Sequence, residues 1–483
     1  MILAIDQGTT GTTVLLVDHS GAIVDSGYAE IRQFYPKPGW VEHDAEEIAQ
    51  GAIRLAREVC LRQGATPRAI GIVNQRETVV LWERKTGKPL GRAIVWQDRR
   101  TAPLCQELKA DEPLFRDRCG LLLDPYFSGT KLAWMLDSDP AVRAAAESGD
   151  LAAGTIDAWL IWNMTGGAVH ATDFTNASRT LCCDIRRGEW DGELLDKLRL
   201  PRCILPQILP SCHAFGPCIL PGPLKGAMIG GVAGDQQAAL FGQACWKPGL
   251  IKNTYGTGCF LMSWIGAALD VPADPILATA AASAGPEKTY ALEGAVFVAG
   301  AAVQWLRDEM GLIESAADTD AIARSVSDSH GVFVVPAFAG LGAPHWDSSA
   351  RGAILGLTRG AGRAHIVRAT LESIAYQTAD LLAVPALARN AKELRVDGGA
   401  CRNDFLMQFQ ADILGMPIDR PARTETTALG AAFLAGLQCG FWSGLDELEA
   451  LRQTERVFEP AMGDERRQAL LADWRKAVRR VLG

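Results

Sequence analysis

Two short loops rich in glycine and threonine follow apolar runs that we predict to be strands. The first loop, residues 6–10, reads Asp-Gln-Gly-Thr-Thr, and the second, residues 254–258, reads Thr-Tyr-Gly-Thr-Gly. Small residues let a backbone approach an anion closely, while its amides and hydroxyls donate hydrogen bonds. A carboxylate beside such a loop, here Asp6, is a suitable ligand for Mg²⁺. Each loop alone is compatible with a simple tight turn, but together the two loops indicate a polyphosphate held between them.

Two further segments of small residues lie near the end of the chain. Residues 396–400 read Val-Asp-Gly-Gly-Ala and precede a predicted helix over residues 405–414, so their glycines would admit a flat ring. Residues 427–436 predict a helix of small side chains, which suits either close packing on another helix or a plain buried core. The sequence contains none of the usual signatures of P-loop enzymes, dinucleotide-binding folds, zinc peptidases or serine hydrolases. A nucleotide site in this chain must therefore be of another type.

Composition excludes several classes of function. The 483 residues include 48 Lys and Arg against 56 Asp and Glu, so a net charge of −8 argues against binding the backbone of nucleic acids. We expect no membrane insertion, because the longest apolar stretch, near residues 294–303, is too short to cross a bilayer. The twelve cysteines are scattered and form no pair with metal-ligand spacing. Reduced thiols in a cytoplasmic protein fit this pattern best.

The elements that must position these loops alternate in type along the chain. Strands are predicted over residues 2–5, 12–17, 22–28, 69–73, 79–82, 93–96 and 227–232. A helix is predicted from an Asx cap at Asp44 to about residue 64, because its apolar side chains keep helical spacing on one face. These patterns predict an α/β protein. A boundary between two large domains is predicted near residue 243.

In this order the loops resemble those of the actin, hexokinase and heat-shock-protein superfamily of nucleotide-binding proteins. Longer strings are similar to the glycerol kinases of the FGGY carbohydrate-kinase family, and the resemblance covers nearly the whole chain. The strings that carry it are residues 34–44, 74–78, 94–97, 124–131, 234–242, 253–260, 292–297, 304–310 and 395–400. The resemblance implies two ribonuclease H-like domains of the actin-like ATPase type around a central cleft. Residues 1–243 would carry a polyol site and the first phosphate loop, and residues 244–483 would carry the nucleotide site.

The activity implied by this resemblance is ATP-dependent phosphorylation of glycerol to sn-glycerol 3-phosphate, with ATP and Mg²⁺ as cofactors and a homodimer or homotetramer as the assembly. One alternative is a kinase of the same family for another polyol or ketose. Such a kinase would keep Asp6, Asp235 and both loops but would lose the Arg76–Glu77 pair, Trp96 or Tyr126, all of which are present. The other alternative is a non-catalytic module gated by a nucleotide.

The resemblance assigns site residues position by position. By themselves Arg76 and Glu77 would be read as a surface pair, and only the surrounding string places them in a site. The expected polyol-binding residues are Arg76, Glu77, Trp96, Tyr126, Asp235, Gln236 and Phe260. Asp235 is expected to be the catalytic base and to share Mg²⁺ with Asp6. The expected nucleotide-binding residues are Thr9, Thr10, Gly11, Thr257, Gly300, Gln304, Gly399 and Asn403.

The chain departs from the family pattern in two places. Thr13 stands where glycerol kinases commonly have an arginine that reaches toward the nucleotide phosphates, so we expect a shifted nucleotide KM rather than lost activity. Residues 212–225 lack the Gly-Gly-Lys-Gly-Gly loop that carries sugar-bisphosphate inhibition in some bacterial relatives. We therefore expect such inhibition to be weak or absent.

Overall fold

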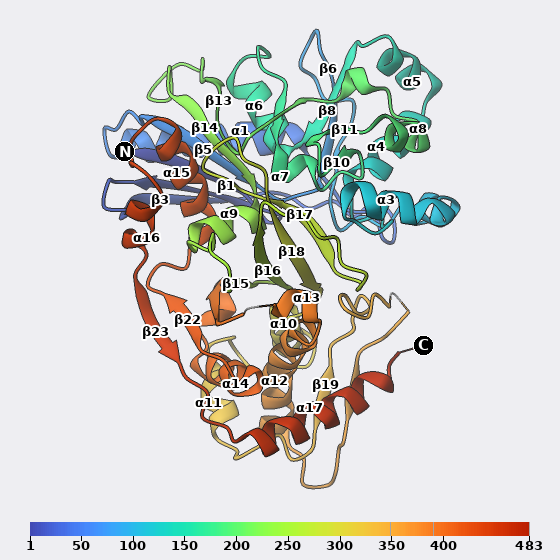
Figure 1. Cartoon of the computed structure of the whole chain (residues 1–483), viewed down its shortest axis with the longest axis vertical. Helices are drawn as coiled ribbons and strands as arrows, with labels where there is room; N and C mark the ends of the chain where they lie inside the picture. Colours follow the sequence, from blue (N-terminus) through green and yellow to red (C-terminus); the bar gives the residue numbers. More distant parts are fainter. Residues whose placement is uncertain (348, 390, 483) are drawn as a thin grey trace.

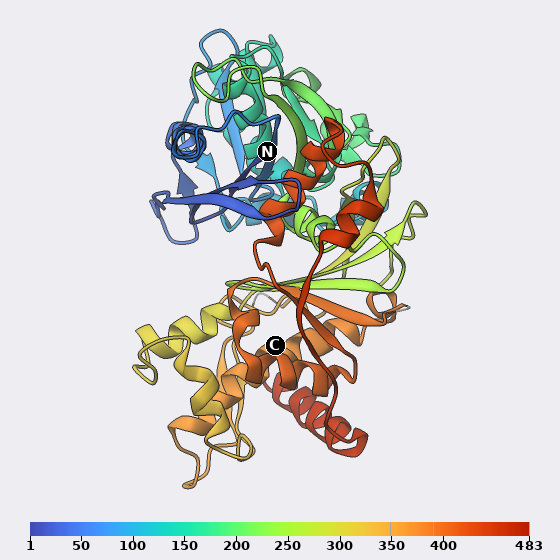
Figure 2. The ribbon, with the colours of Figure 1, turned by 90° about the vertical axis from the view of Figure 1, so that its left-hand side faces the viewer.

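The protein consists of two bodies, each built on a mixed β-sheet that is packed against helices (Figures 1 and 2). The computed structural model describes residues 1–347, 349–389 and 391–482. In Figure 1 the strands of the first half of the chain lie in the upper body, and most of the second half lies in the lower body. The chain passes between the bodies more than once, because late helices return to the upper one.

The first sheet has six strands with three parallel strands at its centre. In order across the sheet they are β13 (Cys212–Pro217), β14 (Met228–Gly234), β5 (Ala69–Asn74), β1 (Ile2–Gln7), β2 (Gly11–Val17) and β3 (Ile23–Glu30). β14, β5 and β1 run parallel, whereas β2, β3 and β13 are antiparallel to their neighbours. Alternate residues of β1 point to opposite faces. Leu3 and Ile5 pack with helix α1 (Ala45–Arg62), and Ile2 and Ala4 face helix α15 (Thr426–Gln438).

A second layer of short elements covers one end of this sheet and builds the wall of the site. Its strands β4 (Glu42–His43), β7 (Ala93–Ile94), β6 (Val79–Glu83) and β8 (Leu151–Thr155) form an antiparallel sheet. The helices of this region are α2 (Ala102–Glu107), α3 (Glu112–Cys119), α4 (Ser128–Asp137), α5 (Pro140–Glu147), α6 (Ile156–Met164), α7 (Phe174–Ala177) and α8 (Gly192–Leu198). The aromatic and aliphatic side chains between them form a separate core cluster.

The second sheet has seven strands. In order they are β17 (Leu277–Ala281), β18 (Thr289–Val296), β16 (Cys259–Gly266), β15 (Leu250–Tyr255), β21 (Glu393–Asp397), β22 (Ile418–Pro421) and β23 (Thr454–Phe458), of which β15, β21 and β22 run parallel. One face carries the helices α10 (Gly300–Asp308), α12 (Arg363–Leu382), α14 (Asp404–Leu414) and α17 (Asp464–Arg479), with α11 (Asp318–Arg324) beside α12 and α14. The other face of the sheet meets the upper body.

Helices α9 (Asp235–Gly242) and α15 cross at glycines and join the two bodies. A Cβ added to Gly430 of α15 would lie 2.0 Å from the carbonyl oxygen of Ala238 in α9, so only glycine permits this crossing. α15 packs on β14, β5 and β1 although it comes late in the chain, and Figure 1 shows it with α16 (Leu445–Leu451) beside the N-terminal strands. The close approach of these helices therefore ties residues 426–438 to the first sheet.

The structure confirms the predicted elements of the sequence with shifts of a few residues at their ends. The strands predicted over 2–5, 69–73 and 227–232, the helix from Asp44 and the small-residue helix over 427–436 are all present. The domain boundary near residue 243 stays a prediction. All twelve cysteines are free thiols. Among the described residues, no helix has both the length and the apolar composition that crossing a bilayer requires.

Candidate functional site

The parallel strands of the first sheet deliver three of the predicted segments to one edge. β1, β5 and β14 end at Gln7, Asn74 and Gly234, so the first loop, Arg76 and Asp235 follow strand ends that lie side by side. Asp6 is opposite Thr13 on β2 and Val73 on β5, and such directly paired residues share one face of the sheet. In an open α/β sheet this edge is where ligands bind.

The second sheet presents a complementary row of side chains to the same region. Lys252 on β15 is paired with Met262 on β16, which is paired with Glu293 on β18, so the three share a face. Two residues further along, Thr254 is paired with Phe260 and with Asp397. Glu293 and Phe260, which come from different strands, both contact Arg76 of the first body.

Arg76 is the centre of the contacts between the predicted polyol residues. Its guanidinium donates two hydrogen bonds to the Glu293 carboxylate, from Nη1 at 2.5 Å and from Nη2 at 3.1 Å. Its Nε lies 3.0 Å from Asp235 Oδ1. Nη1 also donates to Gln237 and Nη2 to the Tyr126 hydroxyl at 3.4 Å. Every nitrogen of the guanidinium is thus engaged, which fixes its plane although the side chain is buried.

Arg179 and Glu293 complete a layer of alternating buried charges behind this site, and both escaped the sequence analysis. Arg179 donates from Nε to Glu77 at 2.6 Å and from Nη2 to Glu293 at 3.1 Å. Burial works against the charge of Glu293, but Arg179 and Arg76 outweigh it and lower the pKa of Glu293 to about 2. Burial raises the pKa of Glu77, and Arg179 and Arg76 oppose that rise. Arg179 lies outside the strings that carry the resemblance, whereas Glu293 lies within the string at residues 292–297 but was assigned no role there. The folded arrangement shows that the two residues form a pair.

Three aromatic side chains line the region around the Arg76 guanidinium. The Arg76 guanidinium lies over the Phe260 ring at 5.9 Å, and the rings of Trp96 and Tyr126 meet edge to face at 5.6 Å. Trp96 also donates from its indole nitrogen to the Thr9 hydroxyl at 2.8 Å, which connects this wall to the first loop. Aromatic walls of this kind exclude water from the carbon edges of a small polar ligand.

A buried polar network supports the first loop from behind. Gln33 donates to the Thr9 carbonyl at 2.6 Å, and Gln75 donates to the Gly8 carbonyl at 3.2 Å. His43 lies between the two glutamines, 2.9 Å from Gln33 and 3.3 Å from Gln75. Burial lowers the pKa of His43 to about 4, so the imidazole is neutral near pH 7. The loop is therefore held by neutral hydrogen bonds.

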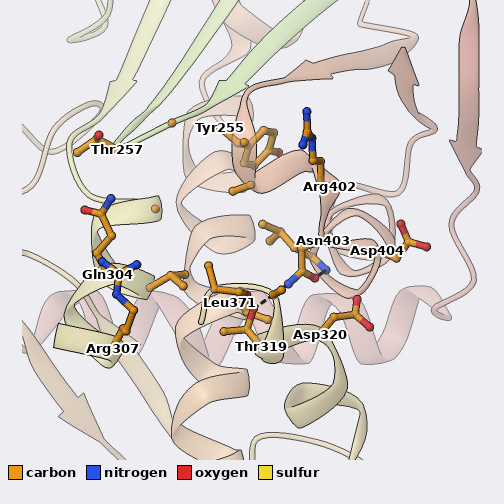
Figure 3. Close-up of a pocket in the computed structure, with 18 residues that line it drawn as sticks. Tyr255, Thr257, Gln304, Arg307, Thr319, Asp320, Leu371, Arg402, Asn403 and Asp404 are labelled. Atoms are coloured by element: carbon orange, nitrogen blue, oxygen red, sulfur yellow. Dashed lines mark hydrogen bonds between the residues drawn. The ribbon is translucent and has the colours of Figure 1, made fainter. Parts of the chain in front are cut away.

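A cavity of about 680 Å³ opens beside the second loop (Figure 3). Gln304 and Arg307 of α10 lie on one side of it, and Arg402 and Asn403 lie on the other. The predicted nucleotide residues that line the cavity are Thr257, Gly300, Gln304, Gly399 and Asn403. Thr9, Thr10 and Gly11 are not among its lining residues, because they belong to the first sheet. The volume and the mainly apolar walls suit a nucleoside.

A side chain would have different consequences at two glycines that line this cavity. A Cβ on Gly300 would lie 2.5 Å from the Gly256 carbonyl oxygen, so the start of α10 can touch the second loop only through glycine. A Cβ on Gly399 would meet no protein atom within 4 Å and would instead project into open space. Gly11, by contrast, is required by packing, because a Cβ there would lie 2.6 Å from the Tyr28 ring.

The carboxylates at the first sheet edge form an environment that suits a divalent cation. Burial, followed by the nearby charges of Asp235 and Glu425, raises the pKa of Asp6 to about 8. A bound cation would relieve this repulsion. Within the described ranges no group of three or more His, Cys, Asp or Glu side chains is placed to hold a metal ion by itself. This donor set fits Mg²⁺, which takes one or two carboxylates and completes its shell with water and phosphate oxygens.

The structure therefore brings the predicted residues together in two groups. The first comprises Arg76, Glu77, Trp96, Tyr126, Asp235, Gln236 and Phe260, with Asp6, Thr9, Thr10 and Gly11 at the adjoining strand end. The second lines the cavity of the lower body. A phosphate chain that runs from the cavity toward Asp235 would connect them. The individual roles of these residues stay predictions.

Comparison with known proteins gives a consistent result. The profile described as "FGGY family of carbohydrate kinases, N-terminal domain" matches residues 1–242, and the corresponding C-terminal domain matches residues 251–439. Glycerol kinase of Leptothrix cholodnii is 55% identical over 495 aligned residues that span 100% of this chain and 99% of that protein. Glycerol kinase 2 of Thermotoga maritima is 52% identical over 489 aligned residues, spanning 100% and 99% of the two chains.

Solved structures resemble the whole chain as well. The crystal structure of Plasmodium falciparum glycerol kinase with ADP superposes with a TM-score of 0.93 at 37% identity, covering 100% of this chain and 98% of that one. A ligand-bound xylulose kinase from Lactobacillus acidophilus gives a TM-score of 0.87 at 23% identity, covering 99% and 97%, and so shares the fold. These matches confirm the predicted fold class, two α/β domains of the actin-like ATPase type.

Proposed function

The chain belongs to the FGGY family of carbohydrate kinases, and from that premise we propose that it transfers the γ-phosphoryl group of ATP to a terminal hydroxyl of glycerol. Relatives above 50% identity over the full length, all named glycerol kinases, support the substrate. The product would be sn-glycerol 3-phosphate. The observation that carries the proposal is the position of Asp235. Its carboxylate forms an ion pair with Arg76, yet the Asp235 side chain is still 31% exposed.

Asp235 is the group placed to act as the base. It is the first residue of α9 and emerges from the end of β14, so its backbone is fixed by both elements. As the hydroxyl oxygen forms its bond to the γ-phosphorus, the bond to the bridging oxygen of ADP breaks and the hydroxyl proton passes to the Asp235 carboxylate. The transition state of such a transfer is loose, so positioning contributes more than proton removal. A base of this kind contributes about 10²- to 10⁴-fold.

Asp6 and Asp235 are the residues that would hold Mg²⁺. When bound, the ion supplies charge neutralisation at the phosphate oxygens. Thr9 and Thr10, at the end of β1, and Thr257, between β15 and β16, would bind the phosphates through hydroxyls and backbone amides. Gly300, Gln304, Gly399 and Asn403 would enclose the nucleoside in the cavity, and Gly11, whose backbone packs against Tyr28, would lie beside the phosphates.

The buried charges give the polyol site both donors and acceptors. Glu77 offers carboxylate oxygens to substrate hydroxyls, while Arg179 donates to it from behind. Arg76 has no free nitrogen, so a substrate hydroxyl that accepts from it takes the place of the longest contact, the one to Tyr126 at 3.4 Å. Trp96 and Phe260 cover the carbon chain. A triol satisfies this set, because each hydroxyl both donates and accepts.

A coupled assay of ADP release tests the proposed function. Purified protein with MgATP is given glycerol, dihydroxyacetone, erythritol, xylulose or no acceptor. The proposal expects the highest kcat/KM with glycerol. If another acceptor gives the highest value, the assignment of Arg76, Glu77 and Tyr126 to glycerol is wrong. If ADP appears equally fast without acceptor, the protein is a nucleotide-gated module rather than a kinase.

The remaining proposals concern organisation. We keep the division into residues 1–243 and 244–483, with α15 as a return crossing from the second part to the first sheet. A homodimer or homotetramer in the cytoplasm is proposed from the family. The twelve free thiols suit a reducing compartment.

A further inference from the structure

A buried lysine lies between the two groups of site residues, and the proposed mechanism does not use it. Lys252 is in the middle of β15, and its side chain is fully buried. Its ammonium donates to Gln236 Oε1 at 2.6 Å and to the Thr254 hydroxyl. Burial lowers the pKa of Lys252, while Asp397 and Asp235 oppose that change. A buried ammonium is costly, and an apolar side chain of similar volume would serve packing equally well.

The contact with Gln236 determines which way its amide points. An ammonium has three donors and no acceptor, so only the carbonyl oxygen of the amide can face Lys252. The amide nitrogen must then point away from Lys252. Among the described residues, no protein acceptor is bonded to Gln236 Nε2, and that atom is not enclosed as an unsatisfied buried group. Gln236 follows Asp235 directly and donates its backbone N–H to the Asp235 carboxylate at 2.7 Å.

From this geometry, and resting on the proposed function, we propose that Lys252 is a positioning residue that locks the Gln236 amide as a hydrogen-bond donor to a hydroxyl of the polyol. The same ammonium holds the Thr254 hydroxyl oxygen, two residues before Gly256 of the second loop. Because that oxygen accepts from Lys252, the Thr254 hydroxyl hydrogen is free to donate elsewhere. Lys252 thus fixes one donor beside the acceptor substrate and one at the base of the phosphate loop.

The consequence is a constraint on substrate selection. A locked donor can bind only an acceptor oxygen, so a polyol that lacks the matching hydroxyl leaves the amide unpaired. Sites built around such a group reject the deoxy analogue strongly. Without the ammonium the amide can rotate, and discrimination between glycerol and a propanediol should fall.

A double-mutant cycle on the full-length enzyme tests the proposal. The variants are Lys252→Met, Lys252→Arg, Gln236→Ala and Lys252→Met/Gln236→Ala. Lys247→Met serves as the control. Lys247 lies five residues before Lys252, is exposed, and forms an ion pair with Glu449. The readouts are the KM for glycerol, kcat, the selectivity for glycerol over propane-1,2-diol and propane-1,3-diol, and Tm. We expect Lys252→Met to raise the KM at least about 10-fold, corresponding to the loss of one well-placed hydrogen bond, and to lower the selectivity. Lys252→Arg should restore part of both.

The cycle separates positioning from structure. If Lys252 acts through Gln236, the Lys252→Met change adds little to Gln236→Ala, and the two effects are far from multiplicative. Multiplicative effects, or a lowered Tm with unchanged KM and selectivity, would overturn the proposal. Failure of the proposed function is seen independently, because wild-type protein would then favour another acceptor. In that case the cycle is run with the acceptor that is turned over, and an unchanged KM for it would overturn the role of Lys252 as well.

Discussion

Replacing Glu293 by glutamine removes the charge on which two buried arginines depend. The side chain keeps its shape, but Arg76 and Arg179 lose the carboxylate that lies 2.5 and 3.1 Å from them. A pKa lowered from 4.5 to about 2 means that the folded structure stabilises the charged form by about 3 kcal/mol at pH 7. Removal of one partner from a buried ion pair costs about 3–5 kcal/mol in general. We therefore expect Glu293→Gln to lower the free energy of unfolding by about 3 kcal/mol.

The sign of the pH dependence gives a second test of the same variant. Because folding lowers the pKa of Glu293, its contribution is complete above about pH 4.5 and is lost as the pH falls toward 2. Wild type and variant should therefore converge in stability in acid. Urea unfolding followed by circular dichroism at several pH values measures both effects.

A matched exposed pair supplies the control for Glu293→Gln. Glu189 is bonded to Arg187 at 2.7 Å, but both side chains are more than half exposed, so Glu189→Gln should change stability by less than about 1 kcal/mol. A loss below about 1 kcal/mol for Glu293→Gln at pH 7, equal to that of the surface control, would refute the reasoning.

Three further predictions follow from the loops and glycines. His43 has a pKa lowered by burial to about 4, so the protein should lose about 3 kcal/mol of stability between pH 6.5 and 4, and His43→Gln should not show this loss in a pH series of unfolding curves. Gly399→Ala should raise the KM for ATP with an unchanged Tm, because the added methyl meets no protein atom. Gly300→Ala should lower Tm as well, because its methyl would clash with the Gly256 carbonyl oxygen. Equal Tm values for the two variants in thermal unfolding would contradict this contrast. Thr13→Arg places a cation directly across the strand pair from Asp6, so steady-state kinetics should give a lower KM for ATP with turnover retained; lost turnover or an unchanged KM would contradict it.

The sequence predicted the local elements and the loops well, because both depend on short-range signals. Apolar runs and turn residues define β1 to β3, and the Asx cap of Asp44 begins α1. The strings around Arg76 and Asp235 predicted that these residues share a site, and the structure places the two in contact. What joins them in space is sheet register, which no local pattern contains.

The residues that escaped prediction act across the chain. Glu293 reaches Arg76 over 217 positions, and Lys252 reaches Gln236 because β15 lies against the start of α9. A lone glutamate or lysine in an apolar strand is a visible anomaly, since burial of an unpaired charge is costly. That anomaly is the signal that marks Glu293 and Lys252. The identity of their partners could come only from the fold.

The most direct test of the account is the single-turnover rate of phosphoryl transfer in Asp235→Asn, measured by rapid quench at saturating MgATP and glycerol. Asparagine keeps the shape of the side chain but cannot accept the proton. We predict a fall of about 10²- to 10⁴-fold in that rate. A variant that transfers phosphate within a few fold of the wild-type rate would contradict the role of Asp235 as the base.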